Sequence, residues 1–549
     1  MSLPTFQPQG ALFSTAALSG QLFPEQDRYR IFARKIYPRL VAARAKLAGA
    51  YCLDNGRPGI EPVLLLGVSL LQYLEGAPDR QAVEMLRYHA GWNFALGSQL
   101  GESVFHPTVL TYFRDRLIEH EQSRLVFAEI LEGLVEAGLV ERRGKQRVDA
   151  TQMLGLLSRM SRLECVRETL RLALQELETG AAAVERPAFW DELWERYVQS
   201  KLDYRTEISV LKLKMDQAGT DAWRLLEWAG QLSDPKVGPG QQLQLLQRVF
   251  GEHFQLAPDK AVVQREAQPP GAVHNPHEAE AQWAAKGAGK HKKEHVGYKV
   301  QVAETVKEVK LQPGEPTQNF LTAVATQDAI ASDEAGLAQV EQEQAALGLQ
   351  KAPILYVDGA YVSAEKLAQA QSEGRQLIGP AQSAPKKEGK FSVEDFQINV
   401  EQRQAVCPAG KHNTQCSRLE EASTGKVDYR FEWSTHCPDC PLRDRCVGHN
   451  QKHRTIVVGQ YHSHLQARRQ EQKTQAFQQQ ARQRNAIEGT QSELVRAHGL
   501  RQARYRGKAK VSLQNYFIGA ACNAKRWIKR IIWELKQAQV GAKLSVVSG

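Results

Sequence analysis

The amino-acid sequence predicts an α/β protein with a mixed-sheet core, an all-helical N-terminal domain, a helical insertion and a small cysteine-rich insertion. The core is predicted because strand patterns return after Pro276 and helical patterns follow two of these strands. The cysteine-rich insertion is predicted because five of the eight cysteines fall between positions 407 and 446. The chain is accordingly divided into 1–140, 141–155, 156–270, 271–385, 386–455 and 456–549.

Residues 1–140 are expected to form the helical N-terminal domain. Apolar residues recur at helical spacing, and helices are expected at Glu61–Leu74, Asp79–Tyr88 and from Pro107 or Thr108 to about His120. A first core strand is expected at Arg147–Thr151, within 141–155, before the charged helical insertion at 156–270.

Residues 271–385 alternate between strand and helix patterns. Strands are expected at Val296–Ala303, Phe320–Thr326, Ala352–Val357 and Gln376–Pro380, and helices at about Ser332–Leu347 and Ser363–Ser372. Residues 386–455 have a loop-like composition. In 456–549, one long helix is expected from Ser463 to Arg496 and a last helix from about Ser512 to Lys536.

The composition is that of a soluble globular protein with excess positive charge. Hydrophobic residues make up 42% and charged residues 24%, which excludes disordered and collagen-like chains. No Lys or Arg precedes residue 26, and the longest apolar run, at 62–71, is shorter than the ~20 residues that span a bilayer. We therefore expect a cytoplasmic protein without a membrane partner.

The excess positive charge lies at one end of the chain. The net charge is +10. Residues 451–549 contain 19 Lys and Arg against 4 Asp and Glu, a charge of +15, and the rest of the chain has 52 against 57. Such a distribution favours a polyanionic partner for the C-terminal segment.

Two aspartates are candidate metal ligands. Asp358 follows the apolar strand Ile354–Val357, where α/β proteins bind ligands, although a loop-capping Asp is the simpler reading. Asp149 lies within a strand pattern between Val148 and Ala150, and a buried carboxylate there would need a cationic partner. A solvent-facing Asp149 is equally consistent with the pattern.

Glu488 is the third candidate acid. Arg484 precedes it by four residues, so an ordinary exposed helix pair is the first interpretation of these two residues. Together, two strand aspartates and one helix glutamate could hold two Mg²⁺ or Mn²⁺ ions for phosphodiester displacement.

The cysteine cluster has the spacing of a structural zinc site. Cys437 and Cys440 form a C-x₂-C pair, Cys446 follows, and Cys407 is the upstream partner. Alternative single ligands are Cys416, His412, His436 and His449. The alternative to zinc is a set of reduced, free cysteines.

Basic residues interleaved with aromatic residues form the third group. The candidate DNA contacts here are Arg501, Arg504, Arg506, Lys508, Lys525 and Arg526, which surround Tyr505 and Trp527. This pattern suits phosphate contact and base stacking, whereas a solvated helix face is the alternative.

Four motifs in order resemble the DDE transposases of bacterial insertion sequences. They are Val148–Thr151, Gly297–Lys299, Tyr356–Tyr361 and Arg484–Gly489. The order is similar more narrowly to the insertion-sequence family numbered eleven-eighty-two. Further similar stretches are Gly56–Gly59 with Trp92–Gly97 and Phe113–Arg114, Cys407–Gly410 with the later cysteines, and Gly499–Arg501, Arg506–Gly507 and Asn523–Arg526.

The resemblance implies a ribonuclease-H-like core and a catalytic triad of Asp149, Asp358 and Glu488 that binds two Mg²⁺ ions. The family signature also has a Tyr and a Lys on the third helix. Ala481 and Val495 stand at those positions, and Arg496, one step further, is a candidate DNA contact. Glu493 is a weaker third acid, because it lacks an Arg four residues before it.

The resemblance further implies a nucleoid-associated bacterial enzyme that cuts transposon ends and joins the freed 3′-OH to target DNA. Double-stranded DNA with terminal inverted repeats would be its partner, recognised by the N-terminal helices, and the protein would act as a dimer or larger assembly. Arg484 would position a DNA phosphate or Glu488. The alternatives are a domesticated DNA-binding regulator without catalysis and a Mg²⁺-dependent endonuclease without strand transfer.

Overall fold

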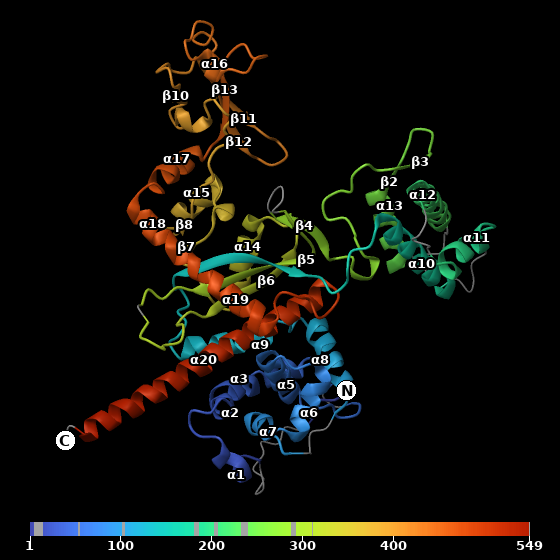
Figure 1. The fold of residues 1–549 in the computed structure, drawn as a ribbon, viewed down its shortest axis with the longest axis vertical. Coiled ribbons are helices and arrows are strands. Elements are labelled where there is room, and N and C mark those ends of the chain that lie inside the picture. Colours follow the sequence, from blue (N-terminus) through green and yellow to red (C-terminus); the bar gives the residue numbers. More distant parts are fainter. Residues whose placement is uncertain are drawn as a thin grey trace.

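A mixed six-stranded sheet forms the centre of the molecule (Figure 1). The computed structural model describes residues 1–4, 15–52, 55–100, 105–180, 186–201, 207–231, 240–286, 292–309 and 311–547. The strands of the sheet are β1 (Gln146–Leu154), β4 (Gln282–Lys286), β5 (Lys293–Thr305), β6 (Leu321–Asp328), β7 (Ile354–Tyr356) and β8 (Gln376–Ile378). The strands predicted from the sequence coincide with β1 and β5–β8.

β1 is the strand on which the sheet changes direction. It is antiparallel to β5 on one side and parallel to β7 on the other, and β7 is parallel to β8. β4 and β6 share the far edge of β5, pairing with residues 293–297 and 298–304 respectively. Gly297 is required where β5 meets the end of β1, because a Cβ there would collide with the backbone of Met153–Gly155.

Helices cover both faces of the sheet. On one face, α14 (Asp333–Ala346) and α15 (Ala364–Ser372) pack against Val148 and its neighbours. Ser332 caps the start of α14, and Ser363 caps the start of α15. On the other face lies α20 (Lys508–Val547), which is longer than predicted and packs on β6, α5 and α9.

The N-terminal helices share one hydrophobic core with α20 and the sheet. They are α1 (Thr15–Ser19), α2 (Arg28–Ile31), α3 (Tyr37–Ala42), α4 (Arg44–Ala48), α5 (Pro62–Glu75), α6 (Asp79–Tyr88), α7 (Ala90–Leu96), α8 (Thr108–Glu119) and α9 (Leu125–Glu136). The three helices predicted from the sequence in this region are α5, α6 and α8. The shared core fixes this region against the rest of the molecule.

A helical block projects from one side of the sheet (Figure 1). It comprises α10 (Arg162–Gly180), α11 (Trp190–Trp194), α12 (Ile208–Gly230), α13 (Gln241–His253), β2 (Phe254–Leu256) and β3 (Val262–Gln264). Its apolar side chains form a separate core around Leu170, Leu225 and Leu246. The block is therefore packed within itself.

The cysteine-rich unit is more regular than its composition predicts. It contains β9 (Gln397–Asn399), β10 (Gln404–Val406), β11 (Gln415–Glu420), β12 (Val427–Glu432), α16 (Arg443–Cys446) and β13 (Thr455–Gly459). β11, β12 and β13 form an antiparallel sheet around Phe431 and Trp433. The prediction of a loop-like segment was wrong, because these short strands bury at most two side chains each and so leave little apolar pattern in the sequence.

The long helix predicted at Ser463–Arg496 is interrupted. The structure has α17 (His462–Glu471), α18 (Gln475–Ala481), a 3₁₀ turn at Arg482–Ala486 and α19 (Ile487–His498). Thr474 starts α18 by accepting a hydrogen bond from the N–H of Phe477. Among the described residues, no helix combines the length and apolar character needed to cross a bilayer.

Candidate functional site

Asp149, within β1, lies beside the point where the neighbouring parallel strand β7 ends, and Asp358 follows that end. Arg147 of β1 is paired with Tyr356 of β7, and each aspartate lies two residues beyond its paired residue. The Asp149 side chain is 11% exposed and that of Asp358 is 36% exposed. The backbone turn after β7 is held by Asp358, whose Oδ1 accepts the N–H of Ala360 at 2.7 Å.

Arg484 joins the two aspartates. Its Nη2 lies 2.8 Å from Asp149 Oδ2 and 3.8 Å from Asp358 Oδ2. Its Nε is buried and has no hydrogen-bond partner among the described residues. The two carboxylates therefore converge on one positive charge, which is the arrangement that a bound cation would also satisfy.

The surroundings of Asp149 and Asp358 disfavour negative charge that no cation neutralises. Burial raises the pKa of Asp149, and the charge of Asp358 adds to this, whereas Arg484 and the N–H of Ala150 act in the opposite direction. Burial and three nearby acids, including both aspartates, also raise the pKa of Tyr361. Carboxylates in such a setting are stabilised by a cation, so the residues present fit a divalent metal site.

Glu488 lies in the first turn of α19, one turn after Arg484. Its side chain is exposed and forms no hydrogen bond or ion pair with a described residue. The Arg484–Glu488 pair suggested by their spacing is thus absent from the described structure. Among the described residues, the ligand atoms of the three predicted triad acids do not all lie within 4.8 Å of one another.

A buried ion-pair network links the elements that carry these residues. Glu304 of β5 is fully buried and accepts from Arg147 Nε at 2.6 Å, Arg526 Nη1 at 3.0 Å and Thr490 Oγ1 at 2.7 Å. Arg147 also donates to the carbonyl of Gln483 at 2.8 Å.

The partners of Glu304 lie close in sequence to the predicted triad. Arg147 is two residues from Asp149, and Thr490 is two residues from Glu488. The network therefore fixes the start of α19 relative to β1. Glu304 was not among the predicted site residues, because it falls one residue beyond the strand expected at Val296–Ala303.

Arg526 and Glu493 belong to this network. Arg526 is 3% exposed and donates to Glu493 Oε2 through Nε at 3.0 Å and through Nη2 at 2.8 Å. A DNA contact was predicted for Arg526, but its guanidinium is buried and already bound to Glu304 and Glu493. Glu493, the weaker candidate for the third acid, faces Arg526 instead of the aspartates.

The other predicted DNA contacts are nearer the surface. Arg496, Arg501 and Arg506 are exposed and form no ion pair with a described residue, and Lys525 is half-buried without one. Lys508 pairs with Asp328 at 2.9 Å. The exposed guanidinium of Arg504 lies over the ring of Tyr73, 4.9 Å from its centre.

The four predicted zinc ligands line one small cavity. Cys407, Cys437, Cys440 and Cys446 surround a space of about 20 Å³, which His436 also lines. Burial raises the pKa of Cys446 to about 11, opposed by Arg454 and reinforced by the other three thiols. The cavity has the size of a single ion or water molecule.

The cysteine sulfurs would have to approach one another to bind one ion. Among the described residues, only Glu493, His498 and Cys522 bring three ligand atoms within 4.8 Å of one another. Thus no three of the four sulfurs meet that distance. The four thiols and the enclosed cavity nevertheless fit the donor set of a tetrahedral zinc ion.

Two family models match the chain. The one described as "Transposase DDE domain" matches residues 406–528, which contain Arg484, Glu488 and the four cysteines. The one described as "Transposase domain (DUF772)" matches residues 19–116, which run from the end of α1 into α8. Asp149 and Asp358 lie outside both matched segments. A comparison with the curated proteins finds none that matches.

Proposed function

Because the chain is a DDE transposase of the insertion-sequence type, we propose that Asp149, Asp358 and Glu488 form the catalytic triad of a ribonuclease-H-like core. Transposases of this kind act on DNA, and the DDE domain implies a divalent metal, usually Mg²⁺. The observation that carries the proposal is the convergence of Asp149, within β1, and Asp358, just past the end of β7, on Arg484. The number of the insertion-sequence family stays a prediction.

The proposed reaction has two phosphodiester exchanges. Water breaks the P–O3′ bond at the transposon end and leaves a 3′-OH, and that 3′-OH then attacks a target phosphate, releasing the target's own 3′-oxygen. Two divalent cations bound by the triad would activate the attacking oxygen and stabilise the leaving oxygen. On DNA binding, Arg484 would exchange its aspartate contacts for a DNA phosphate, and Glu488 would move toward the aspartates.

We also propose DNA and zinc sites outside the triad. The exposed Arg496, Arg501 and Arg506 would contact DNA phosphates, and the N-terminal helices would recognise the inverted repeats as part of a dimer or larger assembly. Arg504, Lys508 and Lys525 would become further contacts if DNA displaces their present partners.

The cysteine cavity would hold one structural zinc ion. Cys437→Ser should remove about one zinc per chain in a metal analysis. Cys416→Ser, a matched change outside the cavity, should retain it; unchanged zinc in Cys437→Ser would exclude the site.

Asp358→Asn tests the catalytic assignment. The amide keeps the turn after β7 but removes one carboxylate charge, so cleavage of transposon-end DNA in Mg²⁺ should fall by at least about 100-fold. Asp259→Asn, an exposed aspartate between β2 and β3, is the matched control and should cleave like the wild type. Equal cleavage by Asp358→Asn and the wild type would refute the triad.

The same reaction separates the alternatives. Target DNA is added, and joined products are scored. Cleavage without joining would indicate a Mg²⁺-dependent endonuclease. DNA binding without cleavage by the wild type would indicate a non-catalytic regulator.

A further inference from the structure

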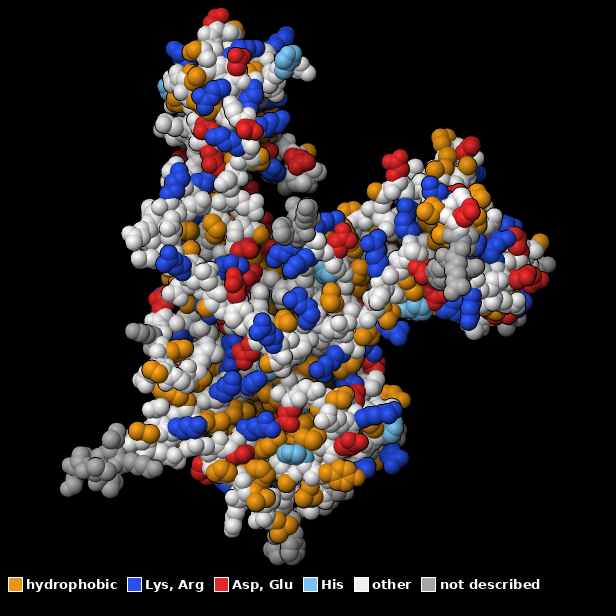
Figure 2. Space-filling model, in the orientation of Figure 1, with side chains coloured by type: hydrophobic (Ala, Val, Ile, Leu, Met, Phe, Trp, Pro, Cys, Tyr) orange, Lys and Arg blue, Asp and Glu red, His pale blue; other side chains and the backbone are white. Residues whose placement is uncertain are grey.

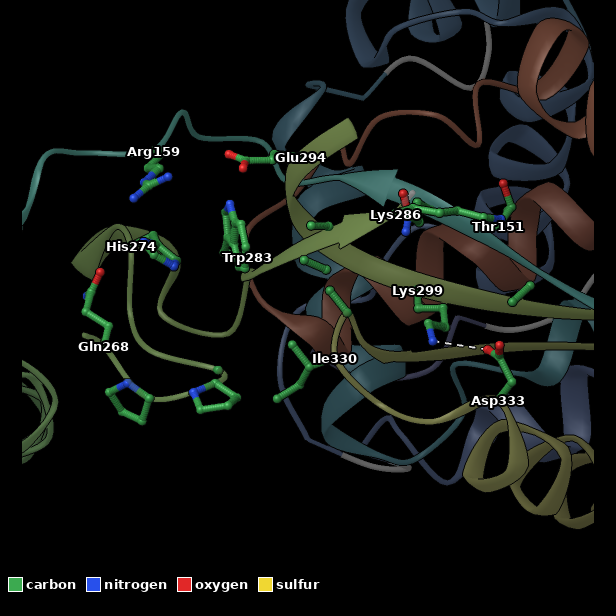
Figure 3. Close-up of a pocket in the computed structure, with 18 residues that line it drawn as sticks. Thr151, Arg159, Gln268, His274, Trp283, Lys286, Glu294, Lys299, Ile330 and Asp333 are labelled. Carbon is green, nitrogen blue, oxygen red and sulfur yellow. Dashed lines mark hydrogen bonds and ion pairs between the residues drawn. The ribbon is translucent and has the colours of Figure 1, made fainter. Parts of the chain in front are cut away.

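A groove runs along β1 from the proposed active site toward the helical block. It consists of two cavities of about 840 Å³ and 430 Å³ that share Arg159, Trp283 and Glu294 as lining residues. The larger cavity is lined by Ala150, the residue that follows Asp149. One wall of the groove is the edge of the sheet at β4, and the other is the segment that returns from the helical block, as Figure 3 shows for the larger cavity.

Three cationic and two acidic side chains line the groove. Arg159 and Lys286 are exposed and form no ion pair with a residue in the described part of the chain. Lys299 is bound to Asp333 at 3.1 Å, which the dashed line in Figure 3 marks. Glu294 is paired with Lys292 at 2.7 Å. The two unpaired cations therefore leave the groove with a net positive charge that suits phosphate groups.

An aromatic ring stands between these charges. Trp283 of β4 lines both cavities, and its indole projects into the groove in Figure 3. Lys292 Nζ lies 5.2 Å from the centre of its ring. A partly exposed indole flanked by cations is the arrangement on which bases of single-stranded nucleic acids stack.

His295 provides a second, independent sign of a ligand. It lines the smaller cavity, is only 9% exposed, and neither ring nitrogen has a hydrogen-bond partner among the described residues. Burial lowers its pKa, and Arg501 and Lys299 lower it further, so the imidazole is neutral near pH 7. A neutral imidazole offers one donor and one acceptor, which a base edge or a sugar could satisfy.

We propose that this groove holds unpaired nucleotides of the DNA strand next to the phosphodiester bond cut at Asp149. Trp283 stacks on a base, Arg159 and Lys286 contact phosphates, and His295 hydrogen-bonds a base or sugar. The occupant is single-stranded because a base in a duplex offers no free face to Trp283. The inference rests on the proposed function and adds to it a strand-separated substrate.

The test uses a synthetic forked duplex with short unpaired oligothymidine arms. One 2-aminopurine is placed in the arm of either strand, in two separate probes, and no Mg²⁺ is added, so the DNA stays intact. Binding of wild-type protein should change the 2-aminopurine fluorescence of one probe, which identifies the bound strand. Absence of any change with both probes would overturn the inference.

Variants of Trp283 show whether the indole is responsible. Trp283→Ala should abolish the fluorescence change and weaken binding of the forked probe about 10- to 100-fold, with binding of the fully paired duplex unchanged. Trp283→Phe keeps an aromatic face and should retain most of the fluorescence change and most of the affinity for the forked probe. If Trp283→Ala has the melting temperature of the wild type but still binds the forked probe and changes its fluorescence like the wild type, the assignment of Trp283 is overturned. If Trp283→Ala melts at a lower temperature, loss of binding and of the fluorescence change in Trp283→Phe would overturn the assignment instead.

Two lysine variants test the phosphate contact, and the cleavage assay tests the triad separately. Lys286→Gln should weaken binding of the forked probe several-fold, whereas Lys387→Gln, an exposed lysine in the segment between β8 and β9, should not. Equal effects would overturn the phosphate contact. If the wild type cuts transposon ends but Trp283→Ala binds the forked probe normally, only the groove inference fails. If Asp358→Asn still cuts, the proposed triad fails, whatever the forked probe shows.

Discussion

Arg484 occupies the position between Asp149 and Asp358 that a cation would take. Its contacts of 2.8 Å and 3.8 Å neutralise part of the negative charge that the two aspartates bring together. A divalent ion and the guanidinium cannot both lie there. We therefore propose that Arg484 stabilises the metal-free protein and would compete with a divalent metal for the two aspartates.

Arg484→Gln should separate these two effects. Without added Mg²⁺, the free energy of unfolding should fall by about 1–3 kcal/mol, because two partly buried carboxylates no longer have their charged partner. Added Mg²⁺ should raise the melting temperature more in the variant than in the wild type, because no guanidinium must be displaced. Thermal denaturation of zinc-loaded protein with and without Mg²⁺ measures both changes.

The control for this experiment is Arg482→Gln. Arg482 is exposed, lies two residues from Arg484 and forms no ion pair with a described residue. It should melt like the wild type in both conditions. An equal Mg²⁺ response in Arg484→Gln and the wild type would show that the guanidinium and the metal do not compete.

The two candidate aspartates could be predicted from the sequence, but the side chains that bind them in the folded protein could not. Asp149 and Asp358 stood out because each follows or interrupts an apolar strand pattern. The bond from Arg484 to Asp149 joins residues 335 positions apart, and helical spacing pointed to Glu488 instead. The partners of Glu304 are also distant in sequence, since they come from β1, α19 and α20.

The start of α19 is held by hydrogen bonds to distant residues as well as by local helix propensity. A continuous helix was predicted because Ser463–Arg496 is rich in Gln and Arg, which favour helices. The 3₁₀ turn at Arg482–Ala486 instead brings the Gln483 carbonyl to Arg147 and the Arg484 guanidinium to Asp149. Contacts formed only in the folded molecule thus override the local preference at this point.

Thr490→Val should weaken the link between α19 and β1. Valine keeps the shape of threonine but removes the 2.7 Å bond to Glu304 and the 2.8 Å bond from Arg526. Unfolding free energy should fall by about 1–2 kcal/mol. Single-turnover cleavage should slow by about 10-fold because Glu488 would be less well positioned, and Thr490→Ser should restore most of the rate.

A threonine in the helical block is the matched control. Thr169 is fully buried and donates to the carbonyl of Cys165 at 2.6 Å. Thr169→Val should therefore reduce stability by a comparable amount without slowing cleavage. If both variants slow cleavage equally, Thr490 contributes only to general stability and not to the position of α19.

The excess positive charge of the molecule comes from the C-terminal segment of the chain. Residues 451–549 have 19 basic against 4 acidic side chains. Part of this charge is used internally, since Arg526 is buried and Lys508 pairs with Asp328. Figure 2 shows Lys and Arg side chains across the middle of the face that it presents, above the N-terminal helices. The net charge of this segment could be predicted from the sequence. Which of its Lys and Arg side chains remain available to DNA depends on the ion pairs that form in the folded molecule.

The exposed arginines should set the salt dependence of DNA binding. The triple variant Arg496→Gln, Arg501→Gln and Arg506→Gln removes three guanidinium groups that pair with no described acid. Removing one phosphate-binding side chain should lower the slope of log K against log salt by about 0.9, so a total change of up to about 3 is expected. Fluorescence anisotropy titrations with duplex DNA at several salt concentrations measure the slope.

A second triple variant tests whether the location of the charge matters. Lys201, Lys212 and Lys260 are exposed on the helical block, and changing all three to Gln removes the same net charge. Because nonspecific attraction depends on total charge while counterion release depends on phosphate contact, the slope should stay near that of the wild type. Equal slopes in the two triple variants would mean that DNA does not contact the C-terminal arginines preferentially.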